Sequence, residues 1–207
     1  MIGNHAFQLA SAVYLESIGT GAPSRVDFTN VLLARNTLTS PTAEKSVINA
    51  YAHFRNLDLR MNHLTFADNL NQAALRVRPG DFAGRYITAT LTNTLIVNTD
   101  TDYVGYVGFS ITSATILHTN TFTQTVANHH VGQGSFGALF IAIAINPLTG
   151  DAKLDTNKHL LSGSAAIDAG VDAGIYIDID GQKRPFGLAP DIGADEYSPL
   201  FLPLILR

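Results

Sequence analysis

The chain has 207 residues, a formal net charge of −4, no cysteine, and only 14% charged residues. The low charge content lies well below the roughly 25% usual in globular domains, which argues against a charged helical bundle and favours a β-rich surface of neutral polar groups. The absence of cysteine excludes disulfides and thiolate metal sites, and a pI near 5.9 offers no basic surface for nucleic acid.

The N-terminal stretch, residues 1–19, contains no lysine or arginine and no apolar core followed by a small-residue cleavage site. It therefore does not have the features of a signal peptide. Elsewhere, no apolar run approaches the roughly 20 residues that a membrane-spanning helix needs. We expect no transmembrane segment.

Four segments share an alternation of apolar and polar residues that ends on asparagine: residues 25–36, 57–69, 89–98 and 109–120. Their corresponding aliphatic residues are Leu32, Leu64, Leu95 and Ile116, spaced by 32, 31 and 21 residues, and their closing residues are Asn36, Asn69, Asn98 and Asn120. Such self-similarity predicts a solenoid in which the aliphatic residues form one column and the asparagines one ladder. The alternative is a β-sandwich whose loops hold the asparagines.

A second set of short strands is predicted upstream of these segments, at residues 11–16, 46–54, 73–77 and 103–109. Each coil would then contain at least two strands, and the period is too short for β-α-β units with their crossover helices. We therefore predict an all-β chain whose residues 1–150 form the coils of a solenoid. The apolar run 138–146 is either a strand buried on both faces or a short core helix.

Residues 159–197 are dense in Gly, Pro and Asp, which predicts successive tight turns between very short strands. The segments "GSAAIDAG", "DIDGQKRPFG" and "APDIGADEY" resemble the closing segment of secreted bacterial right-handed parallel β-helix proteins, the choice-of-anchor Q proteins. The resemblance implies a right-handed parallel β-helix of a few coils, closed by residues 151–197, in a secreted or cell-surface protein. With no signal peptide, we expect a fragment of a longer chain, and we expect a monomer.

The tail, residues 198–207, is apolar and interrupted by Pro199 and Pro203, which forbid a regular helix. Two interpretations stay open. The tail either packs over the open end of the solenoid or acts as a surface-retention signal.

Carboxylates in the closing segment suggest a calcium site. Asp178 and Asp180 have the D-x-D-G spacing of many calcium loops, and Asp191 and Asp195 follow in the same Gly- and Pro-rich stretch. The alternative is that these aspartates only make turns. The histidines, including the adjacent pair His129–His130, lack the spacing of a metal motif.

Two classes of function remain open for a β-helix of this kind. An enzyme of the pectate-lyase-like type, a polysaccharide lyase or a glycoside hydrolase, would need acidic and basic residues on one outer face. The candidates are Asp58, Asp68, Arg60, Arg76 and Arg78, with Asp100 and Asp102 as a weaker carboxylate pair.

A module that binds polysaccharide would instead show exposed aromatics and neutral amides. Its candidate stacking residues are Tyr51, Phe54, Tyr86, Tyr103 and Tyr106, whereas Phe28, Phe66 and Phe109 are expected in the core. We expect a secreted or cell-surface module that binds carbohydrate or serves as a structural stalk, with the lyase or hydrolase as the alternative. The sequence assigns no catalytic residue.

Overall fold

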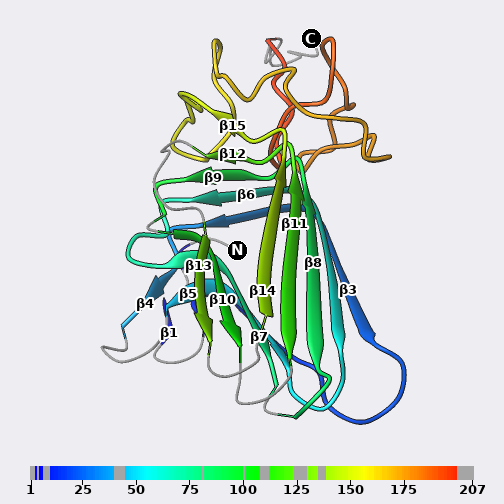
Figure 1. Ribbon diagram of the computed structural model, residues 1–207. Coiled ribbons are helices and arrows are strands. Elements are labelled where there is room, and N and C mark those ends of the chain that lie inside the picture. Colours follow the sequence, from blue (N-terminus) through cyan, green and yellow to red (C-terminus); the bar gives the residue numbers. More distant parts are fainter. Residues whose placement is uncertain are drawn as a thin grey trace.

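The computed structural model describes residues 3, 5–6, 10–39, 45–80, 82–99, 101–107, 112–123, 130–134 and 139–199 (Figure 1). These residues form strands, turns and irregular segments and contain no helix, which confirms the all-β prediction. Within the same residues there is accordingly no helix long and apolar enough to span a membrane.

The strands follow one another along the chain without an intervening helix in the described residues. They are β1 (His5–Ala6), β2 (Val13–Glu16), β3 (Ser24–Ala34), β4 (Thr37–Leu38), β5 (Ser46–Ala52), β6 (Leu57–Ala67), β7 (Ala73–Pro79), β8 (Tyr86–Thr92), β9 (Leu95–Val97), β10 (Thr101–Val107), β11 (Ser113–Thr119), β12 (Phe122–Thr123), β13 (His130–Gly134), β14 (Leu139–Ile145) and β15 (Leu148–Thr149).

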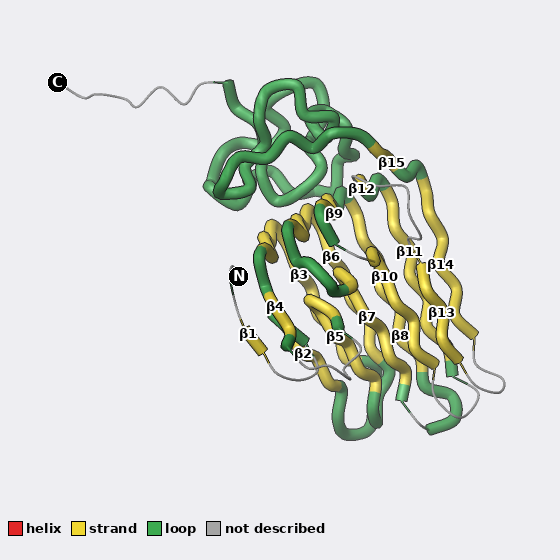
Figure 2. Tube along the Cα trace, turned by 90° about the vertical axis from the view of Figure 1, so that its left-hand side faces the viewer, coloured by secondary structure: helices red, strands yellow, loops and turns green. Residues whose placement is uncertain are grey.

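Two sheets make up most of the molecule. The small sheet has the order β13-β10-β7-β5-β2, and the large sheet has the order β14-β11-β8-β6-β9-β12-β15 with β3 paired to β6. The pairings between named strands are all parallel. Figures 1 and 2 show the strands of each sheet side by side in a curled arrangement. Such parallel, curled sheets are compatible with the predicted solenoid.

The chain repeats one path through these sheets. A strand of the small sheet leads into a long strand of the large sheet, and a sharp corner then leads into a short segment that pairs with its counterparts in neighbouring passes. Corner residues that meet in successive passes lie 26 to 33 residues apart in the sequence. This spacing accounts for the self-similarity seen in the sequence.

The first corner of each pass is made by a residue with a positive φ angle. The column consists of Asn30, His63, Asn93, Asn120 and Asn146, with φ values between 48° and 55°. The left-handed conformation costs roughly 1–2 kcal/mol for most L-residues, and asparagine tolerates it best because its short side chain bonds locally. We call this set the corner column.

A second corner follows a few residues later in the first three passes. It is made by Arg35, Asp68 and Asn98, again with φ near 52°. The strand ladders bring these residues into register, and Nδ2 of Asn98 donates to Oδ1 of Asp68 at 2.8 Å. The predicted asparagine ladder is confirmed between Asn36 and Asn69, one position further along.

The predicted register of the repeats was wrong. Leu32 pairs with Thr65, and Leu64 pairs with Val31 instead. Ile116 pairs with Ala89, before the corner rather than after it. Leu32 and Leu95 do share a column, because Leu95 also pairs with Thr65, and Leu64 lies one position out of it. The error at Ile116 arises because each pass contains two corners, and the sequence alignment matched the first corner of its segment with the second corner of the others. Asn98 lies opposite Asp68, one position before the Asn36–Asn69 ladder, and Asn120 lies at the first corner, so neither continues the ladder.

The run 138–146 contains the strand β14, not a helix. The expectation that it is buried on both faces is wrong, since Ile141, Ile143 and Ile145 are 37–49% exposed. β14 pairs only with β11 among the described strands and forms an edge of the large sheet. The three isoleucines pair with Thr115, Leu117 and Thr119 of β11, which lie on the outer face of the sheet, and this explains the exposure.

The interior between the two sheets is apolar. Leu59, Met61 and Phe66 from β6 are fully buried with Leu75 and Ile87 from the neighbouring strands. Each such side chain stabilises the fold by roughly 1.5–3 kcal/mol relative to an exposed position. A second cluster, which includes Leu95, Phe122 and Ile192, joins β9 and β12 to the chain beyond β15.

Residues 151–197, the predicted closing segment, lie over one end of the strands in Figure 2 and contain two isolated antiparallel bridges but no longer strand. They are bonded to the corner column: Gly193 N donates to Asn93 O at 3.0 Å, Val171 N to Asn93 Oδ1 at 2.9 Å, and Asn120 Nδ2 to Ala169 O at 3.0 Å. Of the apolar tail, residues 200–207 lie outside the described part of the chain, so both interpretations of it stay predictions.

Candidate functional site

The outer face of the large sheet carries rows of neutral hydrogen-bonding side chains. Inward residues such as Ile87, Ala89 and Leu91 of β8 are fully buried, so the alternate residues of that strand point outward. The parallel ladders align these residues with equivalents on β3, β6 and β11. We call the set Thr29, Asn62, Thr88, Thr90, Thr92, Thr115 and Thr119 the hydroxyl face.

The spacing of the hydroxyl face is set by the sheet. Thr88 lies opposite Thr115, and Thr92 lies opposite Thr119, on neighbouring strands about 4.8 Å apart. Along each strand, successive outward residues lie about 6.6 Å apart. One row of the face, Thr29, Asn62, Thr92 and Thr119, is neutral and polar across four strands, whereas Thr90 lies between Arg60 and Leu117.

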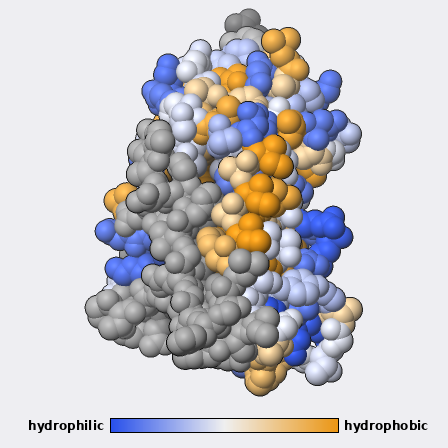
Figure 3. Space-filling model, in the orientation of Figure 1, coloured by the Kyte–Doolittle hydropathy of each residue, from blue (hydrophilic) through white to orange (hydrophobic). Residues whose placement is uncertain are grey.

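Charged residues occupy one margin of the hydroxyl face. Arg25 and Asp27 of β3 form an exposed ion pair at 2.9 Å, and they lie opposite Asp58 and Arg60 of β6. Pairs of this kind contribute about 1 kcal/mol or less and are usual on solvated surfaces. The opposite margin is β14, whose exposed isoleucines form the apolar stripe visible over that strand in Figure 3.

The acidic and basic residues suggested for a lyase do not gather on one face. Asp58 and Arg60 lie on the outer face of the large sheet, whereas Arg76 and Arg78 lie on β7 of the small sheet. Asp68 lies at a corner and pairs with Lys158 at 2.5 Å. The side chain of Asp102 and all of Asp100 lie outside the described part of the chain.

An aromatic group lies in the turns that lead into the large sheet. Phe54 precedes β6, and Phe82 precedes β8; their ring centroids are 5.2 Å apart, and the rings are 40% and 48% exposed. The ring of His53 stacks on Phe54 at 3.9 Å and on Tyr51 at 4.9 Å. Phe54 and Phe82, which we call the aromatic ledge, thus present ring surface to solvent.

The remaining aromatic predictions divide as follows. Phe66 is fully buried, and Phe28 packs against the core, as expected. Tyr51 is only 9% exposed, so it offers little ring surface. Tyr86 is half-buried at the start of β8. Phe109 and the side chains of Tyr103 and Tyr106 lie outside the described part of the chain, as do His129 and the side chain of His130.

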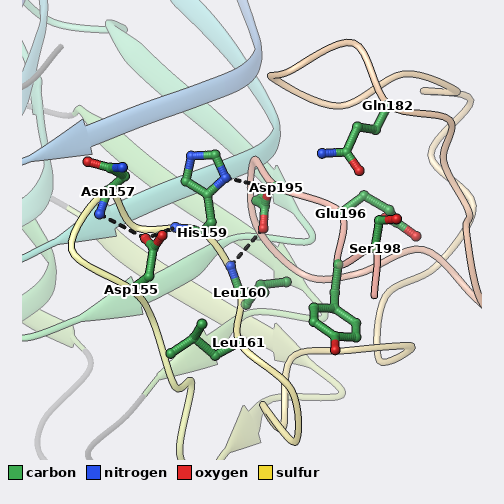
Figure 4. A pocket seen from close by; sticks show the side chains of 10 residues that line it. Asp155, Asn157, His159, Leu160, Leu161, Gln182, Asp195, Glu196 and Ser198 are labelled. Atoms are coloured by element: carbon green, nitrogen blue, oxygen red, sulfur yellow. Dashed lines mark hydrogen bonds and ion pairs between the residues drawn. The ribbon is translucent and has the colours of Figure 1, made fainter. Parts of the chain in front are cut away.

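A pocket of about 400 Å³ opens in the closing segment (Figure 4). Its walls include His159, Leu161, Gln182, Asp195 and Tyr197, from turns far apart in the sequence. The turn that presents His159 is fixed by Asp155, whose Oδ1 accepts bonds from the backbone amides of Asn157 at 2.8 Å and His159 at 2.9 Å.

His159 lies between two carboxylates at this pocket. Its Nδ1 is 3.3 Å from Oδ2 of Asp180 and 3.5 Å from Oδ1 of Asp195. One ligand atom from each of the three side chains lies within 4.8 Å of the other two. Sequence reasoning missed His159, because its partners are distant in the chain and form no motif.

The four aspartates of the calcium prediction have different surroundings. Asp180 and Asp195 point toward His159. Asp178 accepts backbone amides on both oxygens, from Gln182 at 2.7 Å and Glu196 at 3.0 Å. The carboxylate of Asp191 is likewise bonded to two backbone amides. The structure thus brings two of the four together around the histidine and engages the other two in turns.

A buried ionic centre lies beneath the closing segment. Arg184 is fully buried and donates to the backbone oxygens of Asp191 at 2.9 Å and Ala194 at 3.0 Å, with Oε2 of Glu196 at 3.5 Å and the ring of His63 also in contact. Burial raises the pKa of Glu196, and it raises the pKa of Asp191 to about 7. Burial and then the Arg184 charge lower the pKa of His63 to about 3. This centre joins the closing segment to His63 of β6, and its Glu196 also lines the pocket.

No protein-family model, curated protein or solved structure matches this chain. The resemblance to the choice-of-anchor Q proteins accordingly stays a prediction made from the sequence. The functional argument rests on the hydroxyl face, the aromatic ledge and the pocket of the closing segment.

Proposed function

We propose that this protein is a secreted or cell-surface polysaccharide-binding module built on a right-handed parallel β-helix of a few coils. The observation that carries the proposal is the hydroxyl face. One row of aligned side chains, Thr29, Asn62, Thr92 and Thr119, crosses four parallel strands, and Thr88, Thr90 and Thr115 lie beside it. A polysaccharide presents a repeating array of hydroxyl groups, which such a row can hydrogen-bond.

The aromatic ledge complements this face. Phe54 and Phe82 are exposed in the turns just before β6 and β8, two of the strands that carry the hydroxyl face. An exposed aromatic ring offers flat apolar surface to the C–H face of a sugar, while hydroxyl side chains bond its polar rim. Aromatic and neutral polar groups together favour binding over catalysis.

The distribution of charge supports the same function. A lyase or hydrolase needs acidic and basic residues that converge on one substrate. Here Asp58 and Arg60 are separated from Arg76 and Arg78 by their placement on different sheets, and Asp68 is paired with Lys158 at a corner. The separation of these candidate acidic and basic residues supports binding over catalysis on the sheets.

The test is a sedimentation assay with a panel of insoluble polysaccharides, run on the wild-type protein and on the double variant Thr88→Val/Thr115→Val. Valine keeps the shape and the β-propensity of threonine and removes only the hydroxyl. Loss of two hydrogen bonds of about 1 kcal/mol each predicts a Kd at least tenfold higher. Thr156→Val, at an exposed position in the closing segment, is the matched control.

Phe54→Ala tests the aromatic ledge separately and should weaken the same interaction. Equal affinity of the wild type and the Thr88/Thr115 variant would refute the hydroxyl face as the binding site. If the protein bound no polysaccharide, the proposal would be refuted and the role of a structural stalk would be favoured. Release of unsaturated products or new reducing ends would instead assign the lyase or hydrolase.

A further inference from the structure

We propose that His159, Asp180 and Asp195 bind one divalent transition-metal ion at the pocket of the closing segment, and that Zn²⁺ suits the site best. This inference is independent of polysaccharide binding, because the pocket and the hydroxyl face share no residue.

The geometry of the three donors fits a single small ion. Zn²⁺ binds imidazole nitrogen and carboxylate oxygen at about 2.0–2.2 Å, so two donors on one tetrahedral ion lie about 3.3–3.5 Å apart. Nδ1 of His159 lies 3.3 Å from Oδ2 of Asp180 and 3.5 Å from Oδ1 of Asp195. The third separation, within 4.8 Å, closes by a small rotation of the exposed Asp180 side chain.

The donors are held in place by turns that the backbone itself fixes. Oδ2 of Asp195 accepts the amide of Leu160 at 2.7 Å, which leaves Oδ1 directed at the ring of His159 (Figure 4). The turn before Asp180 is bonded to Asp178, since the Asp180 amide donates to Oδ1 of Asp178 at 2.9 Å. Outer bonds of this kind orient metal ligands and raise affinity.

The charge of the cluster provides a second, independent argument. The side chain of Asp195 is only 9% exposed, and in the described part of the chain its ion-pair partner is His159, with no lysine or arginine in such a pair. Two carboxylates converge on one imidazole in a partly buried place. A divalent cation would offset that desolvation cost.

The donor set selects the ion. Calcium takes six to eight oxygen ligands, and the engaged carboxylates of Asp178 and Asp191 do not add to this cluster. A nitrogen donor favours a borderline ion over calcium or magnesium. Three protein donors would leave a fourth coordination position for a water or a small ligand, as in zinc sites that exchange one.

Isothermal titration of the untagged protein with ZnCl₂ and, in a separate run, with CaCl₂ tests the site. We expect one saturable Zn²⁺ site, a rise in Tm on saturation, and at least a tenfold loss of affinity in Asp180→Asn and His159→Ala. His53→Ala is the matched control, because in the described part of the chain His53 pairs with one carboxylate, Oε1 of Glu16 at 2.7 Å.

Circular dichroism of each variant shows whether it is folded, and Asp180 is exposed enough for its amide variant to fold. Absence of saturable Zn²⁺ binding, or unchanged binding in both His159→Ala and Asp180→Asn, would overturn the proposal. A loss of Zn²⁺ affinity in His53→Ala equal to that in His159→Ala would also overturn the proposal. Tighter binding of Ca²⁺ than of Zn²⁺ would overturn the assignment of zinc and support a calcium site instead.

Discussion

Asn36 and Asn69, 33 residues apart in the chain, are joined by a hydrogen bond of 3.1 Å from Nδ2 of Asn36 to Oδ1 of Asn69. The same Oδ1 accepts the backbone amide of Asn36 at 3.0 Å, and Nδ2 of Asn69 donates to Leu33 O at 2.8 Å. Both side chains are fully buried. Asn69 thus satisfies the backbone of the preceding pass at its second corner.

Replacing Asn69 with alanine should destabilise the protein by about 2–4 kcal/mol, because it leaves a buried amide and a buried carbonyl without partners. Equilibrium urea unfolding measures the change. Asn157→Ala, at an exposed position whose side chain is not needed for a backbone bond, should change the stability by less than about 0.5 kcal/mol. Similar losses in the two variants would contradict the role assigned to Asn69.

The strands and the corners could be predicted from the sequence because period-two alternation and asparagine are local signals. The register in which the strands pair could not be predicted. The corner column mixes His63 with four asparagines, and the second corner mixes Arg35, Asp68 and Asn98, so no single residue type marks either corner. Only the pairing of distant strands shows which corner is which.

The same distinction holds at the candidate metal site. Asp178, Asp180, Asp191 and Asp195 are equivalent in sequence pattern, since each stands in a Gly- and Pro-rich stretch. The fold alone decides that the oxygens of Asp178 and Asp191 accept backbone amides and that His159 joins the other two. Residues from three separate turns form no motif of fixed spacing in the sequence, so their proximity could not be predicted from it.

Arg184→Met should destabilise the protein by about 3–5 kcal/mol, since it removes the charged partner of the buried Glu196 and the hydrogen bonds to the carbonyls of Asp191 and Ala194. Arg25→Met, which removes one side of the exposed pair with Asp27, should cost about 1 kcal/mol or less. Urea unfolding of both variants gives the comparison. A loss at Arg184 no larger than that at Arg25 would show that the buried centre does not stabilise the fold.

The low pKa of His63 predicts a dependence of stability on pH. Burial, and secondly Arg184, lower this pKa from 6.5 to about 3. Between these pH values the unfolded chain binds a proton at His63 that the native state does not. The contribution of His63 to the free energy of unfolding therefore falls by about 1.4 kcal/mol for each unit by which the pH is lowered. The raised pKa of Asp191 acts in the opposite direction between its ordinary 3.8 and about 7.

The variant His63→Asn separates the two contributions. Asparagine suits the positive φ of this position, as its four neighbours in the corner column show. The stability of the variant relative to wild type should increase as the pH falls from about 6.5 toward 4, because only the wild type carries the His63 penalty. The Asp191 contribution is common to both proteins. Parallel pH profiles of unfolding free energy would mean that His63 is protonated alike in both states.

Gly193 lies in close contact with the large sheet. Its φ is +114°, and a Cβ there would lie 2.8 Å from Oγ1 of Thr65 and 3.3 Å from Cβ of Leu95. The same Oγ1 accepts the amide of Ala194 at 2.9 Å. Gly193→Ala therefore adds a steric clash to the backbone strain, and it should weaken both this hydrogen bond and the packing of Ile192 in the second apolar cluster.

Gly174→Ala is the matched control, because φ is +73° there and a Cβ would meet nothing within 4 Å. The control carries only the backbone strain of about 1–2 kcal/mol, whereas Gly193→Ala adds about 1–3 kcal/mol for overpacking. Urea unfolding measures the difference, and hydrogen exchange of residues 151–197 locates it. Protection of that segment should fall in Gly193→Ala and persist in the control. Equal stability and equal exchange in the two variants would show that the closing segment does not depend on this contact with β6 and β9.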